Sequence, residues 1–281
     1  MGYRYDPSCR ALLTPAQETT FFRAGRPASE PLLCAELARL AYAAFERNPK
    51  TKADVEATLR QIGFTTCVFF STVSTQGFLA QDPVTPLSVL TFRGTELDPQ
   101  DLATDLNALL VSWPSGGQVH RGFAEALEAD WETLTTILGQ VPGPLLYTGH
   151  SLGAALATLA ASRRPPRALY TFGCPRIGDP AFAASTASLI HQRFVHCCDI
   201  VCRVPPEAMT YCHTGTLAYL DHAGHLYQSP PAPLVADDQR KARLAYLWQW
   251  SWRPGALWSR DTADHAPINY VAALSRALAA P

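Results

Sequence analysis

A five-residue G-x-S-x-G segment, Gly149 to Gly153, constrains the fold of this chain more than any other feature. An apolar run with strand character, 145–148, enters the segment, and a helical pattern rich in Ala and Leu leaves it. A strand, a sharp turn and a helix in this order form a nucleophile elbow, which holds the central serine in a strained backbone conformation. Larger side chains at Gly149 and Gly153 would collide with the neighbouring strand and helix. We therefore take Ser151 as the candidate nucleophile.

The composition fits a single large folded domain and excludes some partners. Of the 281 residues, 47% are apolar and 17% are charged, so the chain can bury a full core. The net charge of −1 gives no electrostatic case for binding nucleic acid. No apolar run reaches the 18 residues that a membrane span needs. Residues 1–7 lack the apolar core of a signal peptide, which predicts a cytoplasmic location, although secretion remains an alternative.

The eight cysteines are predicted to be free thiols. Several stand in apolar contexts of strand character, such as Cys67, where a buried thiol is the simpler reading than a disulfide. The cluster from His196 to His213 has no C-x2-C spacing, so it does not match a zinc site. We expect neither a metal nor a cofactor.

Helical and strand patterns alternate along the chain, which predicts an α/β fold with a mostly parallel central sheet and helices on both faces. Helices are expected at 31–46, 53–61, 121–138, 152–162, 180–188 and 266–279. Strands are expected at 64–74, 77–81, 87–92, 145–148, 167–172 and 191–196, with a hairpin formed by 210–219 and 225–228. We predict one domain, 1–281, interrupted by an insert at about 229–262 that begins at a Pro-rich loop.

A serine nucleophile needs a base and an acid that orients the base. Asp199 follows a predicted strand directly, and His265 stands in a loop just before the terminal helix, from which it can reach Ser151. Asp179 is a reserve candidate for the acid. His150 is expected to point to the other side of the elbow, where it supports the core or the site.

Six stretches, taken together and in this order, resemble the class 3 lipases, the fungal-type triacylglycerol lipase family. They cover roughly residues 33–275. The stretches are 91–95 (TFRGT), 119–123 (VHRGF), 149–153 (GHSLG), 171–179 (TFGCPRIGD), 199–206 (DIVCRVPP) and 264–270 (DHAPINY).

The resemblance implies an α/β-hydrolase fold and a serine hydrolase that cleaves carboxylic esters of lipids without a cofactor. It assigns Ser151 as nucleophile, His265 as general base and Asp199 as its orienting acid. It also implies that Thr95 and the backbone N–H of Leu152 form the oxyanion hole. Asp105 resembles an aspartate that supports the oxyanion hydroxyl, and His213 resembles a structural histidine.

Other functions remain open at this point. A phospholipase A1 and a short-chain carboxylesterase would use the same residues on other esters. A catalytically silent member would bind a lipid or a protein instead. The sequence does not give the oligomeric state.

Two segments have alternative interpretations. Residues 98–113 have an amphipathic helical pattern, which is typical either of a lid over Ser151 or of an ordinary helix packed on the core. The insert holds four of the six tryptophans among several cations, as in Trp250, Trp252 and Arg253. These rings either pack within the fold and cap an acyl pocket, or contact a lipid surface.

Overall fold

An eight-stranded sheet with the strand order β1-β2-β3-β6-β7-β8-β9-β10 forms the centre of the computed structural model. The model describes residues 4–17, 22, 25–72, 74–95, 109–141 and 143–279. Parallel pairing joins β3 (Leu87–Phe92), β6 (Leu145–His150), β7 (Ala168–Phe172), β8 (His191–His196) and β9 (Thr216–Leu220). Antiparallel pairing adds β1 (Thr66–Ser71) and β2 (Gln76–Asp82) at one edge and β10 (Leu226–Gln228) at the other. All residues of β6 and β7 are buried, as expected for parallel strands that helices cover on both faces.

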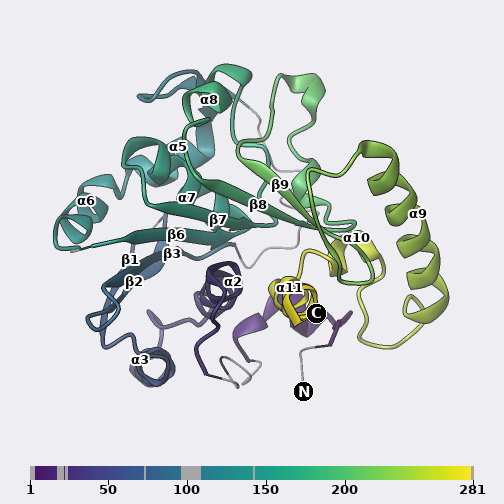
Figure 1. Cartoon of the computed structure of the whole chain (residues 1–281), viewed down its shortest axis with the longest axis horizontal. Helices are drawn as coiled ribbons and strands as arrows, with labels where there is room; N and C mark the ends of the chain where they lie inside the picture. The colour runs from purple at the N-terminus through teal and green to yellow at the C-terminus, as the bar shows by residue number, and fades with distance from the viewer. Residues whose placement is uncertain are drawn as a thin grey trace.

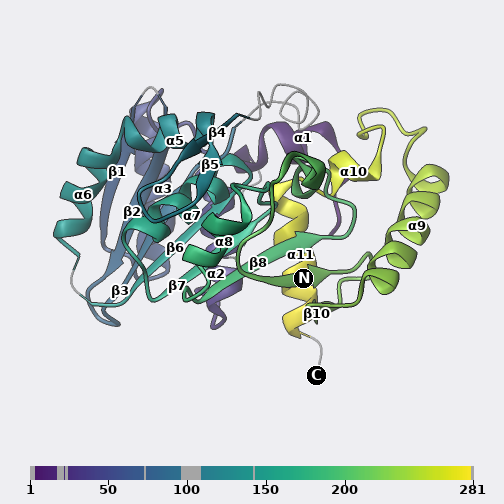
Figure 2. The same ribbon diagram turned by 90° about the horizontal axis from the view of Figure 1, so that it is seen from above.

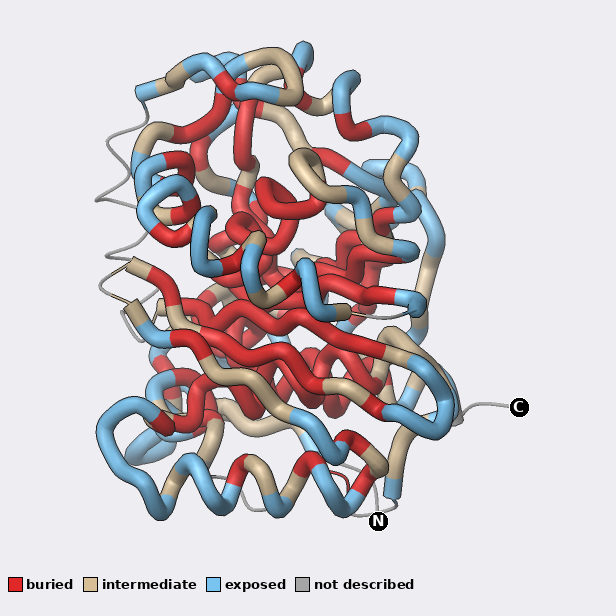
Figure 3. Tube along the Cα trace, turned by 90° about the vertical axis from the view of Figure 1, so that its left-hand side faces the viewer, coloured by how far each residue is buried: buried red, intermediate tan, exposed pale blue. Residues whose placement is uncertain are grey.

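Helices cover both faces of this sheet, as predicted (Figure 1). One face packs against α2 (Glu30–Leu40), α3 (Pro49–Gln61) and α11 (Pro267–Ala279). The other face packs against α5 (Arg121–Glu128), α6 (Trp131–Gly139), α7 (Leu152–Arg163) and α8 (Pro180–Ser185). Buried residues follow the strands and the inner sides of these helices (Figure 3). The chain therefore has the predicted α/β-hydrolase architecture.

Helix α7 determines where the elbow lies in the fold. Its residues from Gly153 to Ala161 are all buried, because the helix is apolar on every side and runs between the sheet and α5. Small alanine side chains let the helix axis approach the sheet closely. Ser151 is thereby fixed at the carboxyl end of β6, near the middle of the sheet.

The remaining elements lie at the periphery. They are α1 (Cys9–Leu13), β4 (Leu110–Ser112), β5 (Gln118–His120), α9 (Ala232–Gln249), α10 (Arg260–Ala263) and the short turns Pro15–Gln17, Val201–Arg203 and Glu207–Met209. Helix α9 lies within the predicted insert, beside the β10 edge of the sheet (Figures 1 and 2). Within the described residues, no helix is both long enough and apolar enough to cross a membrane.

The predicted helix 121–138 is two helices, α5 and α6, which are separated at Ala129–Asp130. Asp130 is buried, and its carboxylate accepts hydrogen bonds from the hydroxyls of Thr72 (2.6 Å) and Thr75. These bonds tie the break to the turn between β1 and β2. A tertiary contact therefore overrides the continuous helical pattern.

The prediction of a helix at 98–113 is wrong for residues 110–112. These residues form β4, which pairs with β5. Trp113 is buried, and its indole N–H donates to Ser162 Oγ at 2.8 Å. Residues 98–108, the main part of the proposed lid, lie outside the described residues, and so does Asp105.

Candidate active site

The elbow has the geometry that the sequence predicts. Ser151 has φ 57° and ψ −126°, a strained conformation for a residue with a side chain. A Cβ atom at Gly149 would lie 2.3 Å from the carbonyl of Gly153, and one at Gly153 would lie 2.4 Å from the carbonyl oxygen of Phe92. Only glycine fits at these two close approaches. The turn thus presents Ser151 Oγ at the carboxyl edge of the sheet.

Ser151, His265 and Asp199 meet at this edge. The Ser151 Oγ lies 3.0 Å from His265 Nε2, and His265 Nδ1 lies 2.9 Å from each carboxylate oxygen of Asp199. Relative exposure is 2%, 3% and 2% for Ser151, His265 and Asp199. The three residues come from the end of β6, the start of α11 and the end of β8, which are far apart in the sequence. This chain of hydrogen bonds, shielded from water, can deprotonate a hydroxyl.

Asp199 is held as a carboxylate. Burial alone would raise its pKa, but the interaction with His265 and the hydrogen bonds from His265 and Tyr270 outweigh burial and lower the pKa below its usual value. The backbone N–H of Val201 also donates to Asp199 Oδ1 at 2.9 Å. Asp199 can therefore keep a negative charge beside an imidazolium.

His150 supports the site from beneath, as expected. Its Nε2 lies 2.8 Å from the carbonyl oxygen of His265, so Nε2 carries the proton and Nδ1 accepts from the hydroxyl of Tyr42 at 2.7 Å. Burial, assisted by the nearby His265, lowers the pKa of His150 well below its usual value. The ring stays neutral and fixes the backbone that carries His265.

Thr95 and Leu152 line a common surface cavity of about 470 Å³, together with Arg93 and Gln76. Leu152 is the first residue of α7, so its backbone N–H has no acceptor within the helix. Arg93 binds the carboxylate of Glu46 at 2.9 and 3.0 Å and the side chain of Gln76 at 3.0 Å. These bonds fix the segment that ends at Thr95. The cavity gives a ligand access to the two predicted oxyanion donors.

The N-terminal segment fastens the loop that carries His265. Tyr5 donates through its hydroxyl to Asp264 Oδ1 at 2.9 Å. The backbone of Asp6 exchanges two hydrogen bonds, of 2.7 and 2.8 Å, with the side-chain amide of Asn269. Arg260 donates to the other carboxylate oxygen of Asp264 at 3.0 Å. The first and last parts of the chain thus together hold His265 in place.

Two further candidates have structural roles. Asp179, the reserve acid, caps α8 by accepting from Phe182 N at 2.8 Å and also accepts from Gln118 N at 3.0 Å. His213 lies close to the carbonyl oxygen of Cys202, with Nε2 at 2.9 Å. Neither of these residues joins the hydrogen-bonded chain of Ser151.

All eight cysteines are free thiols, as predicted. Cys197, Cys198 and Asp264 form a buried group whose ligand atoms lie within 4.8 Å of one another. Both oxygens of Asp264 already accept hydrogen bonds, from Tyr5, Arg260 and the backbone N–H of Cys198. Because Arg260 neutralises this carboxylate, the group fits a structural network better than a cation site.

Sequence reasoning gave no role to Tyr270, although its motif was noted. The Tyr270 hydroxyl donates to Asp199 Oδ2 and accepts from the backbone N–H of His196 at 3.1 Å. It therefore bridges the acid and the strand that leads to it. Its position five residues after His265, on the first turns of α11, was the available signal.

The chain resembles known lipases in sequence. Residues 89–209 match the family model described as "Lipase (class 3)". A lipase of Rhizomucor miehei is 38% identical over 144 residues, which cover 45% of this chain and 39% of the relative. A secreted mono- and diacylglycerol lipase A of Penicillium cyclopium is 32% identical over 185 residues, 58% of this chain and 57% of the relative. The matched parts cover 39% to 42% of the first three relatives, so the chain spans about two fifths of their length.

Solved structures show the same architecture. A lipase from Rhizopus microsporus var. chinensis has a TM-score of 0.56 at 26% identity, over 78% of this chain and 82% of its own. A triacylglycerol lipase described as having a serine protease triad as its catalytic centre has a TM-score of 0.56 at 28% identity. The match covers 70% of this chain and 80% of that lipase. The likeness extends over 70% to 78% of this chain.

The comparisons contradict the predicted cytoplasmic location, because relatives from Fusarium solani and Penicillium cyclopium are named as secreted lipases. Leader peptides are removed from mature secreted proteins, so the composition of residues 1–7 is no guide to location. The family-model match, the shared architecture and the six ordered motifs agree. The central part of this chain, residues 89–209, is therefore similar to the class 3 lipases in sequence and in architecture.

Proposed function

We propose that this protein is a serine hydrolase that cleaves carboxylic ester bonds of lipids, acylglycerols above all, through an acyl-enzyme intermediate. The observation that carries the proposal is the buried chain of hydrogen bonds from Ser151 through His265 to Asp199, with spacings of 3.0 and 2.9 Å. The match of residues 89–209 to the class 3 lipase model supports lipid esters as the substrate class.

The proposed reaction has two steps. In the first, Ser151 Oγ attacks the ester carbonyl carbon while His265 Nε2 takes its proton, and the imidazolium then protonates the leaving alcohol. In the second, water attacks the acyl-enzyme, His265 accepts a proton from that water, and the carboxylic acid leaves as Ser151 regains its proton. Asp199 orients the imidazole through Nδ1 and stabilises its positive form in both steps. These three side chains supply all the acid and base chemistry, so the reaction needs no cofactor.

The backbone N–H of Leu152 and Thr95, through its backbone N–H and hydroxyl, are the proposed oxyanion donors. They line one cavity beside the elbow, which supports a shared acceptor at that point. Loss of one such donor costs about 2.7–4 kcal/mol of transition-state stabilisation in other enzymes.

A fluorophosphonate probe and an ester assay test the reaction type. Ser151→Ala is expected to abolish labelling and to lower hydrolysis of p-nitrophenyl esters by roughly 10⁴-fold or more, and His265→Asn should do the same to hydrolysis. The matched controls are Ser251→Ala and His225→Asn, since both residues are exposed and lie outside the site. A wild-type protein that neither reacts with the probe nor cleaves any ester would instead support a silent, lipid-binding member.

The substrate class is tested with esters from C2 to C16, emulsified triacylglycerol and phosphatidylcholine. A lipase should prefer chains of C8 or longer and should cleave the emulsion. A maximum at C2 to C4 would indicate a short-chain esterase, and release of the sn-1 acyl chain from phosphatidylcholine would indicate a phospholipase A1.

Contact with a lipid surface is part of the proposal. Trp248, Trp252 and Trp258 are 84%, 69% and 64% exposed, so packing within the fold explains only Trp250 among the tryptophans of the insert. Exposed indoles beside cations suit the interface of a lipid layer. The Arg253 guanidinium lies over the rings of Trp250 and Trp252, 4.4 and 5.4 Å from their centroids. The names of the two secreted relatives support a location outside the cell for this enzyme.

A further inference from the structure

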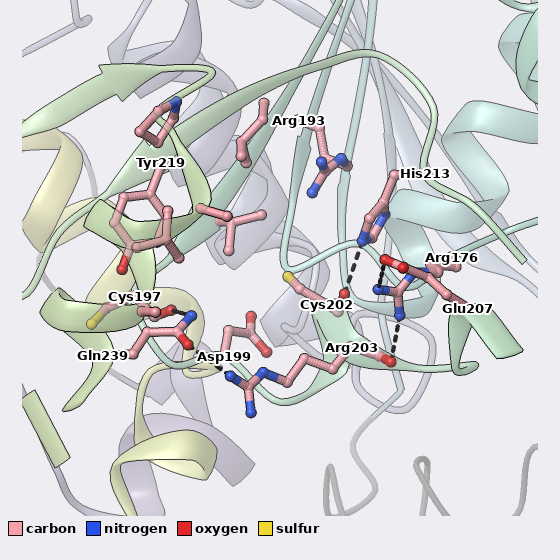
Figure 4. A pocket seen from close by; sticks show the side chains of 16 residues that line it. Arg176, Arg193, Cys197, Asp199, Cys202, Arg203, Glu207, His213, Tyr219 and Gln239 are labelled. Carbon is pink, nitrogen blue, oxygen red and sulfur yellow. Dashed lines mark hydrogen bonds and ion pairs between the residues drawn. The ribbon is translucent and has the colours of Figure 1, made fainter.

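A second cavity, of about 410 Å³, lies behind the candidate acid. Its floor is one face of β8 and β9, and its outer wall is the beginning of α9 (Figure 4). The side chains that matter here are Arg193, Val195, Leu217, Tyr219, Val235 and Ala236. Asp199 lines the same cavity but is engaged by His265, Tyr270 and Val201. The volume lies within the range of small-molecule sites.

Arg193 is a buried cation without a partner among the described residues. Its relative exposure is 7%, its Nε has no hydrogen-bond partner, and no carboxylate forms an ion pair with it. In Figure 4 no dashed line reaches Arg193, whereas Arg176 and Arg203 are both bonded. The residue opposite Arg193 across the β8–β9 ladder is Leu217, an apolar side chain. An unpaired buried charge is strongly unfavourable, so this arrangement calls for an anion.

The surroundings of Arg193 do not supply that anion. Burial, with the nearby charge of Arg193, lowers the pKa values of His191 (to about 3) and His213, so both rings stay neutral. Arg176 lies near and is itself bound to Glu207 at 2.7 Å. The residues that line the cavity include three arginines and two carboxylates, Asp199 and Glu207. The cavity therefore keeps one uncompensated positive charge.

The rest of the cavity is apolar. Val195 and Tyr219 face it from adjacent strands, and Leu217 and Val235 pack against them. His213 Nδ1 has no partner either and can accept a hydrogen bond from water at the polar end. A site with one cation at one end and aliphatic walls beyond it fits a molecule with an anionic head and a hydrocarbon chain.

We propose that this cavity binds a single-chain aliphatic carboxylate, a fatty-acid anion, with the carboxylate on the Arg193 guanidinium and the chain between the β8–β9 face and α9. A planar guanidinium pairs well with a carboxylate through two parallel hydrogen bonds. That the fatty acid is the enzyme's own product rests on the proposed function. Binding itself needs no hydrolysis.

Calorimetric titration of the full chain with decanoate tests the site. To keep the groove beside Ser151 out of the measurement, the titration is repeated on Ser151→Ala and on protein labelled with an alkyl fluorophosphonate. Arg193→Met keeps the volume and removes the charge, so decanoate should bind at least tenfold more weakly. Decanol, which has the chain without the charge, should be insensitive to this substitution.

Two further variants test the location. Leu217→Glu places a carboxylate opposite Arg193 and should abolish decanoate binding by pairing with it. Val235→Trp fills the apolar end and should also abolish binding, whereas Leu234→Trp, an exposed neighbour on α9 that does not line the cavity, should leave it unchanged. Unchanged decanoate affinity in both Arg193→Met and Leu217→Glu would overturn the inference.

The headgroup is tested with other anions. Inorganic phosphate should bind far more weakly than decanoate, and equal affinity would overturn an amphiphilic ligand. Decyl phosphate should also bind more weakly than decanoate. Tighter binding of decyl phosphate than of decanoate would contradict the carboxylate inference and indicate a site for lipid phosphates.

Thermal unfolding separates a ligand site from a structural arginine. Without ligand, Arg193→Met should raise the melting temperature, because an unpaired buried charge is removed. Decanoate should raise the melting temperature of the wild type and not that of Arg193→Met. A lower melting temperature in unliganded Arg193→Met would show a structural role and contradict the inference. If esters are not cleaved while Arg193-dependent binding persists, the proposed function fails and the carboxylate site stands.

Discussion

Tyr270 sets the properties of the candidate acid although it does not touch Ser151. Its hydroxyl donates to Asp199 Oδ2 and is itself fixed by the backbone N–H of His196. This bond is one of the interactions that, against burial, lower the pKa of Asp199. Because the folded-state pKa is lowered, Asp199 stabilises the protein above its unfolded pKa, about 3.9, and this contribution is lost as the pH falls through the folded value.

Tyr270→Phe is expected to lower the free energy of unfolding at pH 7 by about 1.5–3 kcal/mol, the usual contribution of a hydrogen bond to a charged group. The substitution raises the pKa of Asp199, so the difference from wild type should shrink only as the pH falls from the pKa of the variant towards the lower folded-state pKa of the wild type. Urea unfolding at pH 7, 5, 4 and 3 measures both effects.

Tyr147→Phe is the matched control, since Tyr147 is fully buried and its hydroxyl has no hydrogen-bond partner among the residues that the structure describes. This substitution should change the free energy of unfolding only slightly at any pH. A difference between Tyr270→Phe and wild type that stays constant from pH 7 to pH 3 would show that the bond to Asp199 is not its source.

Single residues were predictable where their local sequence constrains them. Ser151 stands between two glycines that the turn requires, and Asp199 and His265 stand at the end of a strand and the start of a helix. Tyr270 and Arg193 look like ordinary helix and strand residues. Their roles depend on partners present or missing across the sheet, such as Leu217 opposite Arg193, which no local pattern encodes.

At the scale of elements, the elbow depends on the close approach of α7 to β3. Gly153→Ala would place a Cβ atom 2.4 Å from the carbonyl oxygen of Phe92, so α7 must move away from the strand. We expect a loss of about 1–3 kcal/mol in unfolding free energy, as for other overpacked positions, together with a loss of more than 100-fold in kcat/KM, because Ser151 shifts with the helix.

Gly139→Ala is the control for this change. Gly139 is also in a helix, at the end of α6, but nothing lies within 4 Å of an added Cβ atom. This substitution should stabilise the protein slightly, by up to about 1 kcal/mol, and leave kcat/KM unchanged. Equal kinetic effects of the two alanines would argue against a packing origin.

The elements that the sequence predicted well have strong local patterns. The strands β6 and β7 are mainly apolar and buried along their whole length, and α7 is rich in Ala and Leu. The predictions of secondary structure are wrong where a contact with a residue distant in the sequence determines the local conformation. Asp130 breaks the long helix because it bonds to Thr72 and Thr75, and residues 110–112 extend because β5 pairs with them.

At the scale of the whole molecule, we propose that residues 1–281 form one domain and that α9, together with the turn that follows it at 250–253, presents a membrane-facing surface. Replacing both Trp248 and Trp252 with Ala should weaken binding to phospholipid vesicles about 100-fold or more, because each indole loses roughly 1.5–3 kcal/mol of transfer free energy. Ester hydrolysis in solution should not change, since neither residue lies in the site.

Val84→Ala combined with Ile190→Ala is the matched control. These side chains are 84% and 66% exposed but lie outside α9. Vesicle binding that falls equally in both double variants would indicate a general effect of surface hydrophobicity. Vesicle binding that is unchanged in the tryptophan variant would show that α9 and the turn at 250–253 are not the contact surface.

The hydrogen bonds between the N-terminal segment and the loop that carries His265 have a consequence for biosynthesis. Tyr5 and Asp6 bond to Asp264 and Asn269, more than 250 positions further along the chain. His265 follows Ser151 and Asp199 in the chain, so the ribosome makes the candidate nucleophile and acid before it makes the candidate base. A nascent or prematurely terminated chain can carry Ser151 and Asp199, yet it has no base between them. The hydrogen-bonded chain of Ser151 can therefore form only after the segment that carries His265 has been made and has folded onto Tyr5 and Asp6.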